Sequence, residues 1–222
     1  MAFKLFSKTI DVDACIELIE NALYERLKEY GFKRYGETLH RFVSEDISQV
    51  ISFQGGQALR NESHLLWVNI GIRVPECFER QFDVDHPEEY YHDYECNMRT
   101  KLGIVKYKDQ NKIRSYDLRK NPDRITADIW EELLTQVLPV FEILNSRENI
   151  LAHRREYPWF DMVNAQEILL EECMIYGHLG DKGKAAECFE MYYYSLVSGL
   201  SEDIQMMRQL EYVDKLRTEL EW

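Results

Sequence analysis

The stretch that decides the fold is residues 31–74, which read GFKRYGETLHRFVSEDISQVISFQGGQALRNESHLLWVNIGIRV. Three segments within it, 38–43, 48–54 and 65–74, are rich in the β-branched and aromatic residues that favour strands. The connections between them are short and polar, whereas parallel strands need a crossover of about a dozen residues. The stretch therefore predicts three consecutive strands of an antiparallel meander, the third long and apolar enough to be central.

The middle segment alternates, so that its side chains point to the two faces of the sheet in turn. We expect Phe32 and Phe42 to lie in the core. Gln54 and Asn69 are polar residues at strand positions, for which hydrogen bonds across the strands are a sufficient explanation. The two sets of the middle segment are Val50, Ser52 and Gln54 on one face, and Gln49, Ile51 and Phe53 on the other.

Residues 11–30 have apolar side chains at steps of three and four, which predicts an amphipathic helix. Asp11 or Asp13 is the expected N-cap, and Gly31 is the expected end of the helix. We expect the apolar stripe to pack on one face of the following sheet. The stripe consists of Cys15, Ile16, Ile19, Leu23, Leu27 and Tyr30.

Several short segments together carry a resemblance to a known family. They are Gly31–Arg34, Arg41–Phe42, Gln49–Gln54, Asn69–Gly71, Glu95–Gly103 and Val137–Phe141. In this order they resemble the bacterial family catalogued as domain of unknown function 4304. The resemblance spans residues 13–150 and implies a shared fold. It implies no established activity and no catalytic residue.

Residues 75–95, PECFERQFDVDHPEEYYHDYE, are strongly acidic and aromatic. A long loop of this kind in a compact domain is often functional. One interpretation is a metal site at His86, His92 and Asp93, although their spacing matches no established motif. Another is a solvated loop with tyrosines packed beneath it. The third is a surface that docks a basic protein partner through rigid tyrosines and carboxylates. Its residues would be Asp83, Asp85, Glu88, Glu89, Tyr90, Tyr91, Asp93 and Tyr94.

The segment after the acidic stretch, residues 101–116, predicts a short pair of strands turning at 109–111. Residues 122–144 then predict a helix that covers the sheet beside the first one. Pro139 falls inside this helix and should kink it or start a new one, because proline lacks the backbone N–H.

A charged segment, residues 145–158, breaks the helical pattern and is a candidate boundary. We therefore expect an α+β domain over residues 1–155, built from an antiparallel β-meander packed by helices. An all-helical extension of three helices follows over residues 156–222, its first helix capped by Asp161.

The chain carries a net charge of −13 and has a pI of about 5.0, a balance that disfavours nucleic acid and anionic membranes as partners. A basic protein partner is favoured instead.

Five cysteines are scattered without a CxxC spacing, which is typical of reduced thiols in a cytoplasm. The first residues show no apolar leader, so we expect a cytoplasmic protein.

No pattern of a known catalytic site occurs, and we predict neither a cofactor nor a metal. The sequence favours a non-catalytic binding protein, for example an acidic immunity- or antitoxin-type protein that docks a basic partner. One alternative is a scaffold or self-association module that acts through the C-terminal helical hairpin. The other is an enzyme with an unrecognised site near His86, His92 and Asp93. The oligomeric state is left open.

Overall fold

The structure, a computed structural model, describes residues 11–44, 46–56, 64–77, 91–109, 112–160, 165–198 and 218. Some predicted features lie outside these ranges. They are the acidic residues of 83–89 together with His86 and Tyr90, the predicted helix cap Asp161, and the third C-terminal helix apart from Thr218.

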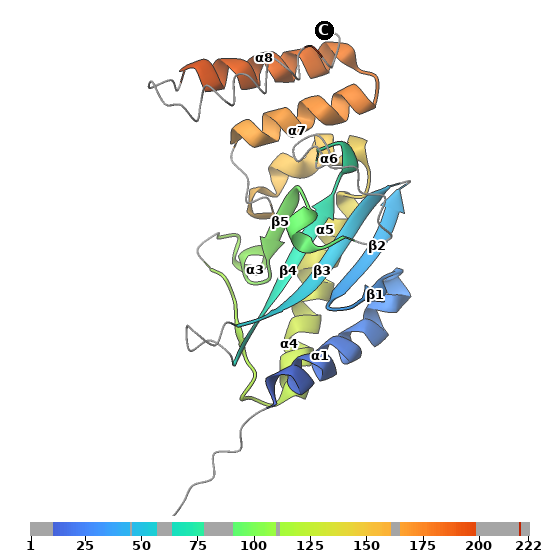
Figure 1. Cartoon of the computed structure of the whole chain (residues 1–222), viewed down its shortest axis with the longest axis vertical. Coiled ribbons are helices and arrows are strands. Elements are labelled where there is room, and N and C mark those ends of the chain that lie inside the picture. Colours follow the sequence, from blue (N-terminus) through green and yellow to red (C-terminus); the bar gives the residue numbers. More distant parts are fainter. Residues whose placement is uncertain are drawn as a thin grey trace, which may run out of the picture.

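Six strands within these ranges form one antiparallel sheet in the order β1-β2-β3-β4-β5, and β6 also pairs with β4. The predicted meander is confirmed in β2, β3 and β4, and the fold class is α+β (Figure 1). The strands are β1 (Lys33–Tyr35), β2 (Thr38–Ser44), β3 (Ile47–Gly55), β4 (Leu65–Arg73), β5 (Met98–Lys101) and β6 (Tyr116–Asp117).

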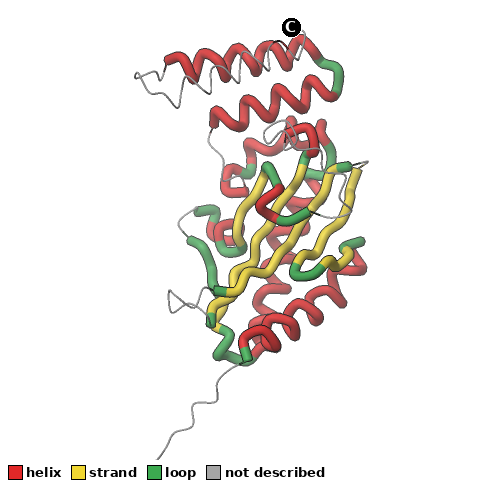
Figure 2. The backbone as a smooth tube through the Cα atoms, viewed as in Figure 1, coloured by secondary structure: helices red, strands yellow, loops and turns green. Residues whose placement is uncertain are grey.

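Three helices, α1 (Val12–Leu27), α4 (Pro122–Glu132) and α5 (Leu138–Ile143), cover one face of the sheet (Figures 1 and 2). Asp11 caps α1 as predicted, since its Oδ1 accepts a hydrogen bond from the Ala14 N–H at 3.1 Å. A short 3-10 turn, η1 (Lys28–Tyr30), follows α1, and Gly31 ends it in the left-handed region with φ of 86°.

The core lies between these helices and the sheet. Register places Leu39, Ile51 and Ile70 in one row across β2, β3 and β4, and all three are buried. Ile19 and Leu23 of α1 belong to the same buried cluster, so the predicted packing of the apolar stripe on the sheet is confirmed for its central residues, whereas Tyr30 at its end is 37% exposed.

The predicted interruption at Pro139 is also confirmed. Between α4 and α5 the backbone widens into a π-helical segment, η4 (Leu133–Val137), in which the Leu138 N–H donates to the Leu133 carbonyl. Pro139 comes next and has no N–H for the α-helical ladder, so the extra residue of the π turn relieves the clash of its ring with the preceding turn.

The helices that follow α5 in the chain lie beyond one end of the sheet (Figure 1). They are α6 (Arg147–His153), the 3-10 turns η5 (Arg154–Glu156) and η6 (Pro158–Phe160), α7 (Ala165–His178) and α8 (Lys182–Ser198). The sequence did not predict α6, which lies in the charged segment taken as a boundary. The division after residue 155 remains a prediction.

Two predictions about side chains and strands were wrong. Phe42 is 50% exposed, because Leu39 points to the core and a residue three positions along the same strand points to the opposite face. The strand pair over 101–116 does not form. Gly103 turns the chain at φ of 94° and starts a short helix, α3 (Ile104–Tyr107), so β5 ends at Lys101.

None of the five cysteines, all of which lie in the described ranges, is part of a disulfide. Within the described ranges, no helix combines the length and the apolar character needed to cross a membrane.

Candidate functional site

The face of the sheet opposite to α1, α4 and α5, here called the open face, is polar along its centre. Register brings Thr38, Ser52, Asn69 and Lys101 into one row across β2, β3, β4 and β5. Side chains directly paired across strands point to the same side, so this row forms one surface. The two faces of the sheet therefore differ in chemistry as well as in packing.

A segment running over the open face, residues 91–97, contains the short helical turn η3 (Asp93–Glu95). The Ser52 hydroxyl donates to Asp93 Oδ1, which attaches η3 to β3. Gly71 leaves room for the segment, since a Cβ there would lie 2.5 Å from the Cys96 sulfur. These contacts position Asp93 above the centre of the sheet.

Tyr91 anchors the start of the segment. Its ring is 7% exposed, and the guanidinium carbon of Arg73 lies 3.7 Å from the ring centre. Phe42, the aromatic residue expected in the core, packs edge-on against this ring, with 6.5 Å between the ring centres. Tyr91 is thus part of the packing beneath the segment.

A pocket of about 910 Å³ lies between η3 and the sheet. It is lined by residues 35–38 of the β1–β2 turn, residues 52–55 of β3, Asn69 of β4 and residues 92–94. Its volume lies in the range of ligand sites in proteins, about 300–1,000 Å³.

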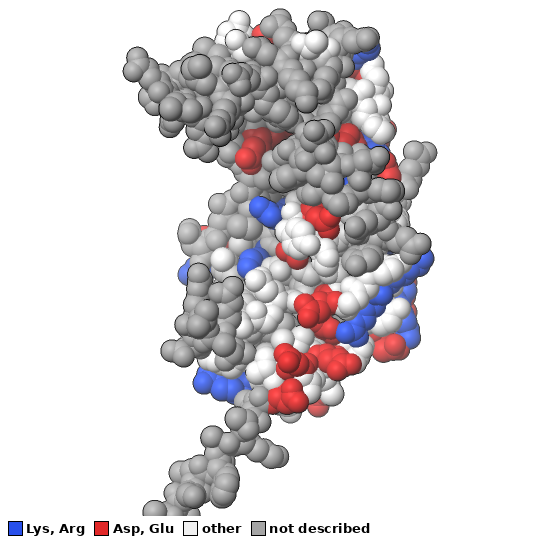
Figure 3. Space-filling model, in the orientation of Figure 1, with Lys and Arg blue, Asp and Glu red and all other residues white. Residues whose placement is uncertain are grey.

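The described lining of this pocket carries two carboxylates, Glu37 and Asp93, and neither lysine nor arginine. Two cations border this lining: Arg34 Nε donates to the Gly36 carbonyl at 3.0 Å, and Lys101 Nζ lies 3.4 Å from Gln54 Oε1. In this view acidic side chains gather over α1 and the adjoining lower edge of the sheet, beside a row of basic ones (Figure 3). The pocket itself is therefore a site for positive charge or for hydrogen-bond donors.

One wall of the pocket is aromatic. The rings of His92 and Tyr94 stack with centres 4.9 Å apart and planes 13° apart. Tyr94 is 63% exposed, so this stacked pair presents a flat surface to solvent.

Asn69 contributes a buried acceptor. Its amide Nδ2 lies 3.4 Å from both Ser52 Oγ and Gln54 Oε1, which confirms the predicted cross-strand hydrogen bonds. Its Oδ1 is buried and has no hydrogen-bond partner among the residues that the structure describes. A buried acceptor without a donor is unfavourable, so this oxygen marks a position where a ligand donor would be stabilised.

Comparison with protein families gives one match, the family described as "Domain of unknown function (DUF4304)", over residues 23–143. This is more than half of the chain. The chain belongs to this family. The comparisons with curated proteins and with solved structures gave no match.

The DUF4304 match includes the whole described lining of the pocket, from Tyr35 to Tyr94. Several residues that carried the resemblance in the sequence come together here. Gln54 and Asn69 line the pocket, while Gly71 and Cys96 pack against each other beside it. In the sequence, cross-strand hydrogen bonds were a sufficient explanation for Gln54 and Asn69. The structure shows that both residues also line the pocket.

The predicted partner-binding residues divide into two groups. Asp93 and Tyr94 line the pocket, whereas Tyr91 is buried in the packing beneath residues 91–97. The other members, Asp83, Asp85, Glu88, Glu89 and Tyr90, lie outside the described residues.

Glu37 and Ser52 were missed by sequence reasoning. Glu37 stands in a turn between two strands and has no local pattern. Ser52 lies on the same face of its strand as Gln54. Two polar side chains on one strand face were the sequence signal that could have indicated a site there.

No group of three His, Cys, Asp or Glu side chains in the described part of the chain is arranged to hold a metal ion. His86, a member of the predicted metal trio, lies outside that part. The Ser52 hydroxyl donates directly to the Asp93 carboxylate, so the two side chains hold each other in place in the described part of the pocket.

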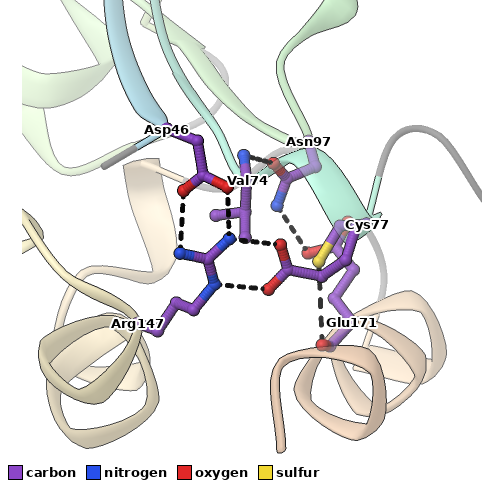
Figure 4. Close-up of polar contacts among 7 residues, drawn as sticks. Asp46, Val74, Cys77, Asn97, Arg147 and Glu171 are labelled. Atoms are coloured by element: carbon purple, nitrogen blue, oxygen red, sulfur yellow. Dashed lines mark hydrogen bonds and ion pairs between the residues drawn. The ribbon is translucent and has the colours of Figure 1, made fainter. Parts of the chain in front are cut away.

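A second polar cluster joins the sheet to the C-terminal helices and lies partly beyond the DUF4304 match (Figure 4). Arg147 of α6 makes paired hydrogen bonds to Asp46 and to Glu76, at distances of 2.7 to 3.1 Å. The hydrogen bonds to Glu76 and Asp46 outweigh burial and raise the pKa of Arg147 above its usual value. Asn97 and Glu171 extend the cluster to α7. Its role is to hold the helices against the end of the sheet.

Proposed function

We propose that this protein is a non-catalytic binding protein that docks a basic segment of a protein partner in the pocket on the open face. The supporting observation is a pocket lined by two carboxylates, with an aromatic wall and no cationic side chain in its described lining. Carboxylates recognise lysine and arginine, and stacked rings give rigid contact area at low entropic cost.

The charge of the whole chain supports the same proposal. A net charge of −13 steers basic partners toward the protein and repels nucleic acid. An immunity- or antitoxin-type role, in which the acidic face covers a basic partner, is one form that such docking can take. In this proposal the predicted acidic residues of 83–89 would extend the docking surface beyond the pocket.

The test is capture of basic proteins and basic peptides on the immobilised full chain at low and raised salt. The double variant Glu37→Gln with Asp93→Asn removes both pocket carboxylates. We expect it to weaken binding of basic peptides by about tenfold or more, because both charges at the site are lost. Binding to the unaltered protein should weaken as salt rises, since the charges are partly exposed.

The matched control is Glu131→Gln with Glu187→Gln, which changes the net charge equally at exposed positions on α4 and α8. Binding should survive in this control. Equal losses in the two double variants would show that only net charge matters and would contradict docking in the pocket.

A second candidate is self-association through the C-terminal helices, because α8 exposes Met191 and Tyr194 by 57% and 67%. Light scattering of the full chain, with and without Met191→Glu and Tyr194→Glu, tests it. A dimer that these changes dissociate would support this candidate, and a monomer at all concentrations would contradict it.

A further inference from the structure

Resting on the proposed function, the nature of the docked residue follows from the hydrogen-bonding groups of the pocket. Its acceptors come from three separate elements. Glu37 belongs to the β1–β2 turn, Asp93 to η3 and Asn69 to β4. A ligand group that uses all three needs several donors spread over a plane or an arc.

The orientation of the Asn69 amide follows from its neighbours. The Ser52 hydroxyl donates its single hydrogen atom to Asp93. Its oxygen can therefore act only as an acceptor toward Asn69. Gln54 Oε1 likewise accepts from the same amide nitrogen. The nitrogen of Asn69 is therefore committed to these two oxygens, and its own oxygen is the group left for a ligand.

Asn69 is also 6% exposed, so its oxygen is far less hydrated than the carboxylates at the pocket surface. A ligand donor that hydrogen-bonds to Asn69 Oδ1 displaces no strongly bound water and gives this buried oxygen the partner that it lacks among the described residues. This makes Asn69 a source of selectivity, beyond the attraction that Glu37 and Asp93 exert on any cation.

The aromatic wall adds a requirement for shape. The stacked rings of His92 and Tyr94 present a flat surface at the same pocket. A guanidinium group is planar, weakly hydrated and able to stack on aromatic rings, and it carries five N–H donors and no acceptor. An ammonium group is a compact, strongly hydrated point charge with three donors.

We propose that the pocket selects arginine over lysine in the docked segment, with the guanidinium group stacked on Tyr94 and hydrogen-bonded to Asn69 Oδ1 and to the carboxylates of Glu37 and Asp93.

The test uses the full chain and two short peptides of equal charge and length that differ only in carrying arginine or lysine. Titration calorimetry measures their affinities. We expect the arginine peptide to bind about tenfold more tightly, because lysine leaves the buried acceptor unpaired. This comparison needs no variant, so it does not depend on any substitution being tolerated.

The variant Asn69→Leu removes the buried acceptor. It should lower affinity for the arginine peptide to that for the lysine peptide and leave the lysine peptide unaffected. The nearly isosteric Asn69→Asp keeps an acceptor oxygen and should retain tight binding of the arginine peptide.

The outcomes separate the two proposals. Equal affinities for the two peptides would overturn arginine selectivity while leaving docking of basic segments in place. Selectivity that persists in Asn69→Leu would overturn the role of Asn69. Absence of binding by both peptides, at low salt, would count against the docking proposal and against arginine selectivity with it.

Discussion

Two buried titratable side chains show how single residues make the stability of this protein depend on pH. His40 lies on the open face among the rings of Tyr35, Phe42 and Tyr91. Burial, together with the nearby positive charges of Lys33 and Arg73, lowers the pKa of His40 from 6.5 to about 4. Glu20 of α1 is 3% exposed, and burial raises its pKa from 4.5 to about 7 despite its ion pair with Arg34.

The pH dependences of these two groups should have opposite signs. Between about pH 4 and 6.5 the unfolded chain binds a proton at His40 that the folded chain does not, so stability falls as pH falls. Between 4.5 and about 7 the folded chain keeps a proton on Glu20 that the unfolded chain has lost, so stability falls as pH rises. Each effect amounts to at most about 3 kcal/mol.

We therefore predict that His40→Gln and Glu20→Gln change the pH profile of unfolding in opposite directions. Relative to the unaltered protein, His40→Gln should gain stability as pH falls from 6.5 to 4, because the unfavourable protonation step is gone. Glu20→Gln should gain stability as pH rises from 4.5 to 7. Urea denaturation across this range measures both, and parallel profiles for all three proteins would refute the pKa assignments.

Among the elements, the contact that shapes the site is the one between β4 and the segment of residues 91–97. It depends on Gly71, where a Cβ would lie 2.5 Å from the sulfur and 2.7 Å from the Cβ of Cys96. The same close approach places Asp93 over Ser52. The placement of Asp93 at the pocket therefore depends on the absence of a side chain at position 71.

The prediction at this scale is that Gly71→Ala destabilises the protein by about 1–3 kcal/mol, as is usual when a packed contact is overfilled. It should also weaken binding of basic peptides, because the segment that carries Asp93 and Tyr94 must move. Thermal unfolding and peptide titration measure the two effects.

Gly177 provides the matched control, since it lies in α7 with nothing within 4 Å of an added Cβ. Gly177→Ala should stabilise the protein by up to about 1 kcal/mol through helix propensity. Equal effects of the two substitutions would show that Cys96 does not constrain the segment.

For the molecule as a whole, the buried cluster around Arg147 holds the C-terminal helices to the sheet. Arg147 is 7% exposed, and its partners Asp46 and Glu76 come from chain segments about seventy to a hundred residues away. Removing Arg147 leaves the carboxylate of Glu76, which is 11% exposed, without its counter-ion, while Asp46 is 43% exposed and stays partly hydrated.

We predict that Arg147→Met lowers the free energy of unfolding by about 3 kcal/mol, measured by urea denaturation. The control is Arg119→Met, which breaks the ion pair with Asp117 on the surface and should cost less than about 1 kcal/mol. A loss at Arg147 no larger than at Arg119 would show that the cluster contributes little.

The sequence by itself determined the elements whose signals are local. The helix after Asp11, the strands around Leu39, Ile51 and Ile70, and the interruption at Pro139 follow from periodicity, capping and the missing N–H of proline. Each of these depends on neighbours a few residues apart along the chain, so the structure agrees with the prediction.

Only the tertiary structure decided what meets on the open face. Ser52 and Asp93 are 41 residues apart in sequence, and the acceptor of Asn69 becomes part of a site only when residues 91–97 cross the sheet. Likewise α6 was missed, because its Arg147 reads as a surface charge until Asp46 and Glu76 are brought against it. Strand register and long-range packing set these neighbours, and both depend on the folding of the entire chain rather than on any local pattern.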